Sequence, residues 1–531
     1  MTTKPRTNRS GASGTGPAVG DRGKTQGSKR TAGRTACAAV IALMLVPAST
    51  LAQSSAASLT LEEAIDLARR NNPVYRSQTN DAAVADWGVR AAYGSFLPSL
   101  SVSSGMSYQA AGPLRFSGAI TGADLGITQT PAYYSSRYGI SFGLSLSGAT
   151  FFELSQARAQ RDATDARISA AAHGLEADVT RQYLATLRAR DAMAIAASAL
   201  ESADRALQLA EVRHQLGAVA RVDVSQAQID RGRAEVGVLR AENDYEMQKL
   251  RLLELLGVQL EAGFEPTSRF AVFEPMWTVE ALTAQALSSH PQLASVRAAE
   301  SAARASSRAA KMSYLPSLSI GGGWSGFVRK TGSDAYLLAQ ARSRAESSME
   351  NCEARNDLSS RLANPYPTED CSLYAFTSAD EAAVLRGNEG FPFDYETDPL
   401  SMSVSISLPI MNGFARERQV QTARIAAQDA AEQTRAEELR RRTEVATNLL
   451  TLRTSYRAVM LEERNAAASS EQLELAQERY RLGAGSILEV TQAQEQKTRA
   501  DQAHLDAVYT FHEALAALEV AVGASLRDVG G

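Results

Sequence analysis

The chain has 531 residues, of which 44% are hydrophobic and 6% aromatic, and this composition excludes collagen-like, disulfide-scaffold and wholly disordered proteins. Its formal net charge of −4 conceals a basic start, because residues 1–52 hold eight Lys or Arg and one Asp. Without them 47 basic and 58 acidic side chains remain (55 − 8 and 59 − 1), and this charge of −11 gives no reason to expect nucleic acid as a partner.

Residues 1–52 are expected to form a basic leader and a signal peptide. Arg30 and Arg34 precede an apolar run at 36–46, and small residues end the segment at Ala52. This order of basic, apolar and small residues is typical of secretory signals and predicts cleavage before Gln53. A membrane anchor is the alternative, although the run is shorter than the roughly 20 residues that a bilayer requires.

The rest of the chain reads as two copies of one unit, predicted at residues 53–264 and 278–523, with a linker at 265–277 and a tail at 524–531. In each copy an amphipathic segment runs into Asn72-Pro73 or His290-Pro291, and a Leu-Pro-Ser-Leu sequence follows at Pro98 or Pro316. Both proline pairs are 218 residues apart (291 − 73 and 316 − 98). A repeat of this size indicates two related supersecondary assemblies and not a short solenoid.

Four segments alternate large apolar with small polar residues and are predicted as strands, at about 98–108, 138–147, 316–325 and 400–409. The same alternation occurs in a soluble sandwich and in an outer-membrane barrel, whose apolar face contacts lipid. The predicted signal peptide and the predicted strand length of about ten residues both favour the outer-membrane barrel, whose strands need about 9 to 11 residues to cross the bilayer. Because membrane barrels begin at about eight strands, a barrel would require oligomers, such as a dimer or a trimer.

Segments with no proline and almost no glycine predict long helices between the strands. They are expected at about 74–96, 152–214 and 219–257 in the first copy, and at about 292–314, 415–482 and 486–523 in the second. A helix of more than about 60 residues would be roughly 95 to 100 Å long, which is the scale of the periplasm and not of a domain. Gly217 and Gly483 end the two longest segments, where they permit a chain reversal.

Two of these predicted helices carry apolar residues at seven-residue spacing. Such a stripe is normally core and predicts helices that pack closely on one another. The residues are Val508, Leu515 and Val522 near the end of the chain, and Val222, Ile229, Val236 and Leu250 in the first copy, with Asn243 completing that series.

The two copies differ most between their paired strands, where a segment at about 326–399 stands in place of a much shorter one. Because long barrel connections lie on the external side, we expect a folded extracellular loop, with an unstructured excursion as the alternative. Cys352 and Cys371 both lie in this loop. They could form a disulfide in an oxidising compartment, and two free thiols are the alternative.

The sequence carries no motif of an enzyme or a cofactor site. His512-Glu513 lacks a second histidine at the spacing of a zinc-binding helix, and no glycine-rich phosphate loop or nucleophile elbow follows a predicted strand. We therefore predict no catalytic residue, metal ligand or cofactor. An export duct explains the four strands, which a periplasmic coiled-coil scaffold or adaptor without a channel would leave without a role.

The duplicated Ala-rich halves, the paired prolines and the segment from Arg479 to Val490 resemble the TolC-like outer membrane efflux proteins over about residues 58–523. The resemblance implies a mainly α-helical protein with a membrane β-barrel. Four strands per chain would complete a twelve-stranded barrel in a homotrimer, above a long α-helical tunnel through the periplasm.

The resemblance also implies a passive duct in the bacterial outer membrane, within a tripartite efflux or type I secretion system. Its implied partners are outer membrane lipid, a periplasmic adaptor (membrane fusion) protein and an inner-membrane pump of the RND, ABC or MFS type.

Roles for residues at the predicted hairpin tips follow from the same resemblance. An acidic ring at the periplasmic constriction would favour cations, and its gate candidates are Asp223, Glu489 and Gln492, the last being often acidic in the family. For Glu489, the alternative is a solvated carboxylate at the end of a helix. Adaptor docking would involve the turns Leu216, Gly217 and Ala218, and Leu482, Gly483 and Ala484. For these turns, the alternative is a glycine that simply ends its helix.

Overall fold

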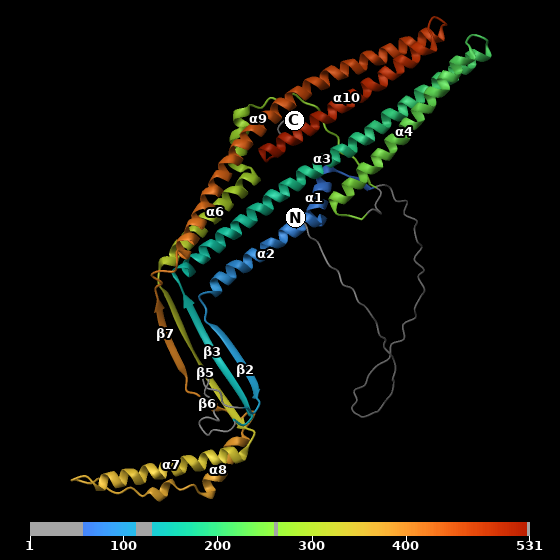
Figure 1. Ribbon diagram of the computed structural model, residues 1–531. Coiled ribbons are helices and arrows are strands. Elements are labelled where there is room, and N and C mark those ends of the chain that lie inside the picture. Colours follow the sequence, from blue (N-terminus) through green and yellow to red (C-terminus); the bar gives the residue numbers. More distant parts are fainter. Residues whose placement is uncertain (1–56, 113–129, 260–263, 528–531) are drawn as a thin grey trace, which may run out of the picture. The chain divides into compact units, whose positions relative to one another are not determined.

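A computed structural model describes residues 57–112, 130–259 and 264–527 (Figure 1). The predicted leader and signal peptide at residues 1–52 lies outside the described residues, as does the end of the predicted tail. Within the described ranges, no helix is both long and apolar enough to cross a membrane.

Each copy contains, in chain order, two consecutive helices, two strands of the main sheet and a long helical hairpin. The first copy comprises β1 (Ala57–Leu59), α1 (Leu61–Asn71), α2 (Pro73–Gly94), β2 (Ser99–Gln109), β3 (Tyr133–Leu146), α3 (Gly148–Gln215) and α4 (Arg221–Leu256). The second comprises β4 (Phe264–Pro266), α5 (Val279–Ser289), α6 (Pro291–Lys311), β5 (Ser317–Thr331), α7 (Asp334–Ser360), α8 (Ser378–Glu389), β6 (Glu396–Thr397), β7 (Ser401–Ser407), α9 (Ala415–Arg481) and α10 (Ile487–Val522).

The four long strands form one antiparallel sheet in the order β2-β3-β5-β7, and the short β6 pairs with the far end of β5. One ladder joins Leu100, Phe142 and Met402 on the apolar face, and the next joins Ser101, Ser141 and Ser401 on the other. The hydroxyls of Ser101 and Ser141 are 2.7 Å apart. The sheet therefore has a bulky apolar face and a small polar face, and β2 and β7 are its edges.

The long helices α3 and α9 have 68 and 67 residues. The Ser147 hydroxyl accepts a hydrogen bond from the Thr150 N–H (3.2 Å), so α3 begins at Gly148 and not at the predicted 152. A Cβ on Gly148 would lie 2.6 Å from the Leu315 Cβ, so glycine permits close contact between the two copies here. The strands also depart from prediction, because β3 begins at Tyr133 and β5 continues to Thr331.

The segment predicted as an extracellular loop is folded, with α7, a short 3-10 helix (Cys371–Tyr374) and α8. In the structure Cys352 and Cys371 are joined by a disulfide with an S–S distance of 2.06 Å. Because β5 leads away from the helices into α7, this helical insertion follows the end of the sheet that is remote from α3 and α9 (Figure 1).

Three hydrophobic clusters hold the described helical part together, one mainly in each copy and a third at the hairpin tips around Tyr480 and Ile487. The first surrounds the buried Tyr183, whose hydroxyl donates to the Leu59 carbonyl (2.7 Å) and accepts from the N–H groups of Thr267 and Ser268 (3.1 Å each). The second contains Phe511 and residues of the predicted stripe on α10. β1 pairs in parallel with β4, which begins at the last residue of the predicted first copy and continues into the predicted linker. This pairing joins the start of the first copy to the segment that leads into the second.

The residue before the first matched proline has the same structural role in both copies. Asn72 accepts from the Tyr75 N–H (2.9 Å) through Oδ1 and donates to the Leu255 carbonyl (2.8 Å) through Nδ2. His290 accepts from the Gln292 N–H (3.0 Å) through Nδ1, and its Nε2 lies 2.9 Å from the Val520 carbonyl. Nε2 also lies 3.2 Å from a guanidinium nitrogen of Arg441. Because Nδ1 accepts a hydrogen bond and a protonated ring has no acceptor, the Gln292 bond requires a neutral imidazole.

We expect His290→Asn to make the protein less sensitive to acid. Burial, and then the charge of Arg441, lower the pKa of His290, so the folded state disfavours the protonated ring. The free energy of unfolding is therefore constant well above the unfolded pKa of about 6.5 and falls as the pH drops below it. Asparagine offers the same acceptor and donor without titrating.

Urea unfolding of both proteins at pH 7.5 and pH 5.5 tests this expectation. His512, whose pKa burial lowers to about 4, titrates in both proteins, so the difference between them isolates His290. Equal losses of stability in the two proteins at pH 5.5 would exclude a role for His290.

Candidate functional site

The predicted tip residues form two matching helix ends. At the end of α3, Gly217 donates to the His214 carbonyl (2.9 Å) and Ala218 to the Arg213 carbonyl (2.8 Å), with φ +73° at the glycine. At the end of α9 the corresponding bonds are from Gly483 to Tyr480 (3.1 Å) and from Ala484 to Arg479 (2.9 Å), with φ +79° at the glycine. Both are Schellman turns, which require a residue that tolerates the left-handed region. Leu216 and Leu482 are left 77% and 72% exposed beside them.

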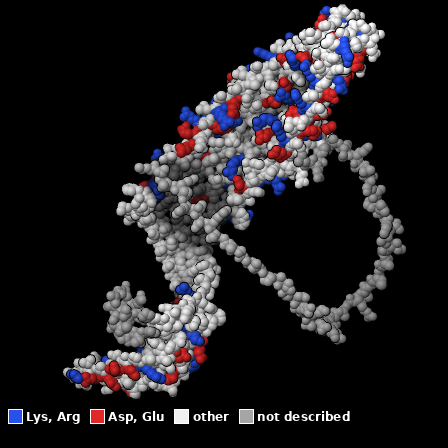
Figure 2. All heavy atoms as spheres, turned by 45° about the vertical axis from the view of Figure 1, so that its right-hand side comes forward, with Lys and Arg blue, Asp and Glu red and all other residues white. Residues whose placement is uncertain are grey.

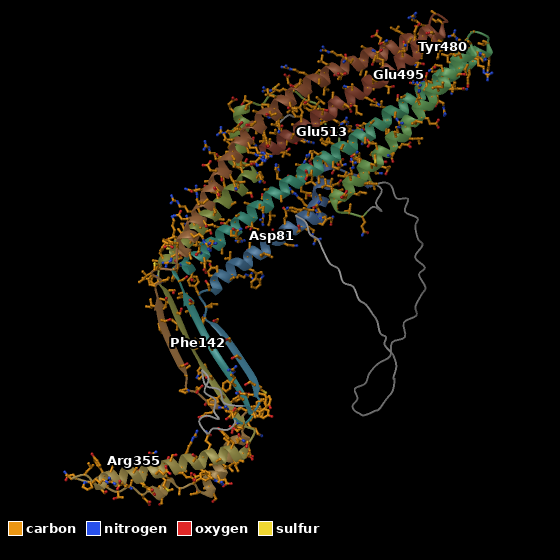
Figure 3. All side chains as sticks on the ribbon, in the orientation of Figure 1. Asp81, Phe142, Arg355, Tyr480, Glu495 and Glu513 are labelled. Atoms are coloured by element: carbon orange, nitrogen blue, oxygen red, sulfur yellow. A yellow bond between two sulfur atoms is a disulfide. The ribbon has the colours of Figure 1, made fainter. Side chains whose placement is uncertain are left out.

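A contact between the two tips was not predicted from the sequence. Arg213 in the last turn of α3 donates to the Tyr480 carbonyl, and its guanidinium lies 4.5 Å from the centre of the Tyr480 ring. Tyr480, which lies near the tips (Figure 3), is 2% exposed, and burial raises the pKa of its hydroxyl. An arginine here also complements the negative end of the α9 dipole. The two hairpins of one chain are therefore linked at their tips.

The predicted gate carboxylates both lie in the first turn of the second hairpin helix. Asp223 accepts from the Ala220 N–H (3.3 Å) at the start of α4. Glu489 donates its N–H to the Ser486 hydroxyl (3.3 Å), and its carboxylate lies 3.3 Å from an Arg479 nitrogen, with a side chain that is 44% exposed. Gln492 is exposed on α10, about one turn further along. The Asp223 carboxylate thus caps its own helix, whereas the Glu489 carboxylate contacts Arg479 and the Ser486 hydroxyl (3.4 Å), and both acids remain partly open to solvent.

A groove of about 370 Å³ lies between the two hairpins, along the parts of α3, α4 and α10 that lead back from the tips. Alanines of α3 form one wall, including Ala196, Ala199 and Ala203, and Asp230 accepts from the Thr491 hydroxyl (3.0 Å) across it. Small side chains leave room for a partner helix to approach closely. This groove was not predicted from the sequence, although the abundance of alanine in α3 indicates close approach of another element.

Both outer helices of the hairpin layer carry exposed apolar stripes. The helices pack in the order α4, α3, α10 and α9. The prediction that the α4 stripe is core is wrong, because Val222, Ile229 and Val236 are 70%, 51% and 46% exposed. On the opposite outer helix, five residues at helical spacing are more than half exposed: Ile425, Leu439, Leu450, Leu461 and Leu475 of α9.

The edges of the sheet are apolar in the same way. Leu100 and Val102 of β2 are 71% and 73% exposed, and Val404 and Ile406 of β7 are 67% and 74% exposed. Figure 2 shows that charged side chains cover the helices and the α7–α8 insertion, while the strands between them are almost free of charge. The sheet therefore has the surface of a membrane barrel wall, open at both edges.

Among the described residues, no group of three or more His, Cys, Asp or Glu side chains is arranged to hold a metal ion. His512 is 2% exposed and packs beside Phe270 and Phe511, so it belongs to the core.

Long paired helices continuous with a sheet that is apolar on one face and serine-rich on the other define a TolC-like outer membrane channel subunit. A family model described as outer membrane efflux protein matches residues 51–258 and 282–524, so the chain belongs to this family. The predicted family and the mainly helical TolC-like fold are thereby confirmed, and the family places the protein in the outer membrane.

Several solved structures are similar to the chain. CusC has a TM-score of 0.63 at 18% identity, covering 88% of this chain and 92% of that one. The CmeC outer membrane channel of Campylobacter jejuni has a TM-score of 0.63 at 15% identity, covering 87% and 85%. The MtrE outer membrane channel of Neisseria gonorrhoeae, in its open state, has a TM-score of 0.60 at 19% identity, covering 88% and 89%. At these identities the likeness shows the fold alone. No curated protein sequence matches the chain significantly.

Proposed function

We propose that three copies of this chain form the passive outer membrane channel of a tripartite efflux or type I secretion system. The observation that carries the proposal is the pair of open apolar edges, α4 with β2 on one side and α9 with β7 on the other. Two different edges that fit one another give a heterologous contact, which closes into a ring when the rotation permits.

The sheet makes this association obligatory. An open strand edge in hydrocarbon leaves backbone groups unsatisfied at a cost of several kcal/mol each. Since successive strands in the order β2-β3-β5-β7 are antiparallel, β7 runs opposite to β2, and β2 of the next copy can continue the antiparallel sheet. Three copies would supply twelve long strands, with the serine face lining the bore and the apolar face in contact with outer membrane lipid.

The energy for transport would come from an inner-membrane pump of the RND, ABC or MFS type, through a periplasmic adaptor. The exposed Leu216 and Leu482 beside the tip glycines, with the alanine groove, offer the adaptor two neighbouring surfaces. A water-filled bore does not select its cargo strongly, so the pump would determine which substrate is exported. A scaffold without a channel would leave the apolar faces of β2 and β7 unexplained.

The proposal is tested with protein extracted from outer membranes in detergent. We expect a heat-labile trimer that conducts ions when reconstituted into planar bilayers. A stable monomer that never associates with lipid would contradict the proposed function.

We expect Glu489→Gln to reduce the cation preference of the reconstituted channel. In a trimer, three copies of this half-exposed carboxylate would lie around one axis, where like charges attract cations, and the effect on the permeability ratio should be about twofold or more. Reversal potentials in a KCl gradient measure it. Glu495→Gln on the same helix, whose carboxylate pairs with Arg499 (3.0 Å), is the matched control (Figure 3). An unchanged reversal potential in Glu489→Gln would leave the Glu489 side chain with its contacts to Arg479 and Ser486 alone.

A further inference from the structure

The serine face of the sheet, which would line the bore of the proposed trimer, is built from small residues over most of its length. The ladders place the odd-numbered residues of 99–103, 139–145, 317–325 and 401–407 on this face, and every one of them is serine or glycine. Side chains of this size leave the bore wide and offer a passing molecule little to bind. The inner and middle parts of the bore should therefore select their cargo weakly.

The same face carries large side chains at its outer end, from which β5 leads into α7 (Figure 1). The next ladder joins Arg137 to Phe327, and the one after it brings Arg329 to this face. These three residues form the mouth cluster. A Cβ on Gly105 would lie 3.9 Å from the Arg137 Nε, so the Arg137 side chain lies over the serine face. Phe327, opposite Arg137 in the ladder, is 48% exposed on that face.

The two arginines of the mouth cluster lie close together. They are diagonal neighbours on β3 and β5, and such positions are about 7 to 8 Å apart in antiparallel sheets. The Arg329 guanidinium lies 3.6 Å from the centre of the Tyr133 ring, which holds it at the face. Among the described residues neither arginine forms an ion pair, whereas Arg342 and Arg355 of α7 both do. Two neighbouring like charges without a counter-charge favour a bound anion.

Two carboxylates at this end of the sheet lie on the β6 side of Phe327. Glu396 is paired opposite Phe327, and Asp398 accepts a hydrogen bond from the Ser325 hydroxyl (2.6 Å). The mouth is thus divided into a basic sector, formed by the mouth cluster, and an acidic sector beside it. Lys330, the next residue along β5, alternates to the opposite, apolar face. An anion in the bore would therefore meet the mouth cluster and not Lys330.

We propose that the mouth cluster binds small organic anions that have an apolar body, such as aromatic carboxylates and sulfonates, and this inference rests on the proposed channel function. Each guanidinium can donate two parallel hydrogen bonds to an anionic group, and the Phe327 ring can pack on the apolar body. Three copies would place three such sites around the outer opening of the bore. Because a duct must also release what it binds, the affinity should be in the millimolar range.

Block of the ion current by benzenedisulfonate tests this site in trimers reconstituted into planar bilayers. The probe is present in both chambers, and KCl keeps the ionic strength constant. We expect Arg137→Gln with Arg329→Gln to raise the half-blocking concentration at least about tenfold, because charge-assisted hydrogen bonds are lost. Lys330→Gln removes a positive charge from the apolar face of the same strand and is the matched control. It should leave the half-blocking concentration unchanged.

Phe327→Ser tests the apolar contact separately. In the wild type, benzenedisulfonate should block at a concentration about threefold or more below that of inorganic sulfate, which carries the charge without the ring. This difference should disappear in Phe327→Ser. All the substituted side chains are exposed, and the unblocked conductance of each variant shows that it has assembled.

Four results would overturn the proposal: no block of the wild type, equal block of the wild type and the double arginine variant, an equal loss of block in Lys330→Gln, or an unchanged difference between the two probes in Phe327→Ser. A wild-type protein that forms no conducting trimer would contradict the proposed function first, so the two failures are distinguishable.

Discussion

Ile229→Asp is expected to prevent trimer formation while each chain remains helical. Ile229 is 51% exposed in the single chain and lies in the middle of the α4 stripe. If this stripe packs against α9 of the next copy, the substitution buries an unpaired carboxylate at each contact, at a cost of about 3 to 5 kcal/mol. A ring repeats this cost at every interface, so the loss of trimer on an unheated denaturing gel should be nearly complete.

The matched control for this substitution is Gln228→Asp, which adds the same charge at an exposed position one residue earlier on α4. A single step turns about 100° around the helix and takes the carboxylate out of the stripe. The control should form trimers as the wild type does. A trimer of normal heat stability in Ile229→Asp would show that α4 is not the contact edge, and the proposed ring would then need a different interface.

Much of the fold could be predicted from the sequence because its strongest signals are local and occur twice. The matched prolines 73 and 291 stand at the starts of α2 and α6, and Gly217 and Gly483 follow the ends of α3 and α9. Proline at the first turn and glycine beyond the last turn act on their own helix, whatever the tertiary contacts. The alternation of the strands is equally local, although it could not fix where β3 and β5 end.

The stripe on α4 was misread for a physical reason. A seven-residue period identifies the apolar face of a helix but not the chain that covers it. On α10 the covering helices belong to the same chain, and Leu515 and Val522 are buried, whereas on α4 Val222 remains 70% exposed. A seven-residue apolar pattern is therefore the same for a helix face that is buried inside its own chain and for one that another chain would cover, so the sequence alone does not distinguish them.

The contact between the tips escaped prediction because it is a long-range pairing of ordinary residues. Arg213 and Tyr480 are 267 positions apart, and the tip motif that contains Tyr480 gives no sign of a partner on the other hairpin. The two residues are not equivalent in the repeat, since Arg213 precedes its tip glycine by four positions and Tyr480 by three (217 − 213 and 483 − 480), so comparing the copies does not pair them. The α7–α8 insertion lies in a segment that is much longer than its counterpart in the sequence of the first copy, so the repeat could not help to predict its fold.

Gly257→Ala is expected to destabilise the first copy strongly. Gly257 ends α4 with φ +72°, a region that costs an L-residue about 1 to 2 kcal/mol. A Cβ there would also lie 2.5 Å from the Asn71 carbonyl oxygen, in the junction between α1 and α2. Overpacking of this kind typically adds about 1 to 3 kcal/mol, and movement of Asn71 would disturb the neighbouring bond from Asn72 to Leu255. We expect a total loss of about 2 to 5 kcal/mol in the free energy of unfolding, measured by urea denaturation.

Gly217→Ala at the tip is the control that separates the two contributions. Its φ of +73° matches that of Gly257, but a Cβ there would meet nothing within 4 Å. It should therefore lose only the backbone term of about 1 to 2 kcal/mol. Equal losses in the two variants would mean that the junction yields to the added methyl group, and that Gly257 is required only for its left-handed conformation. A larger loss at Gly257 would show that the contact of α4 with the α1–α2 junction demands glycine on steric grounds as well.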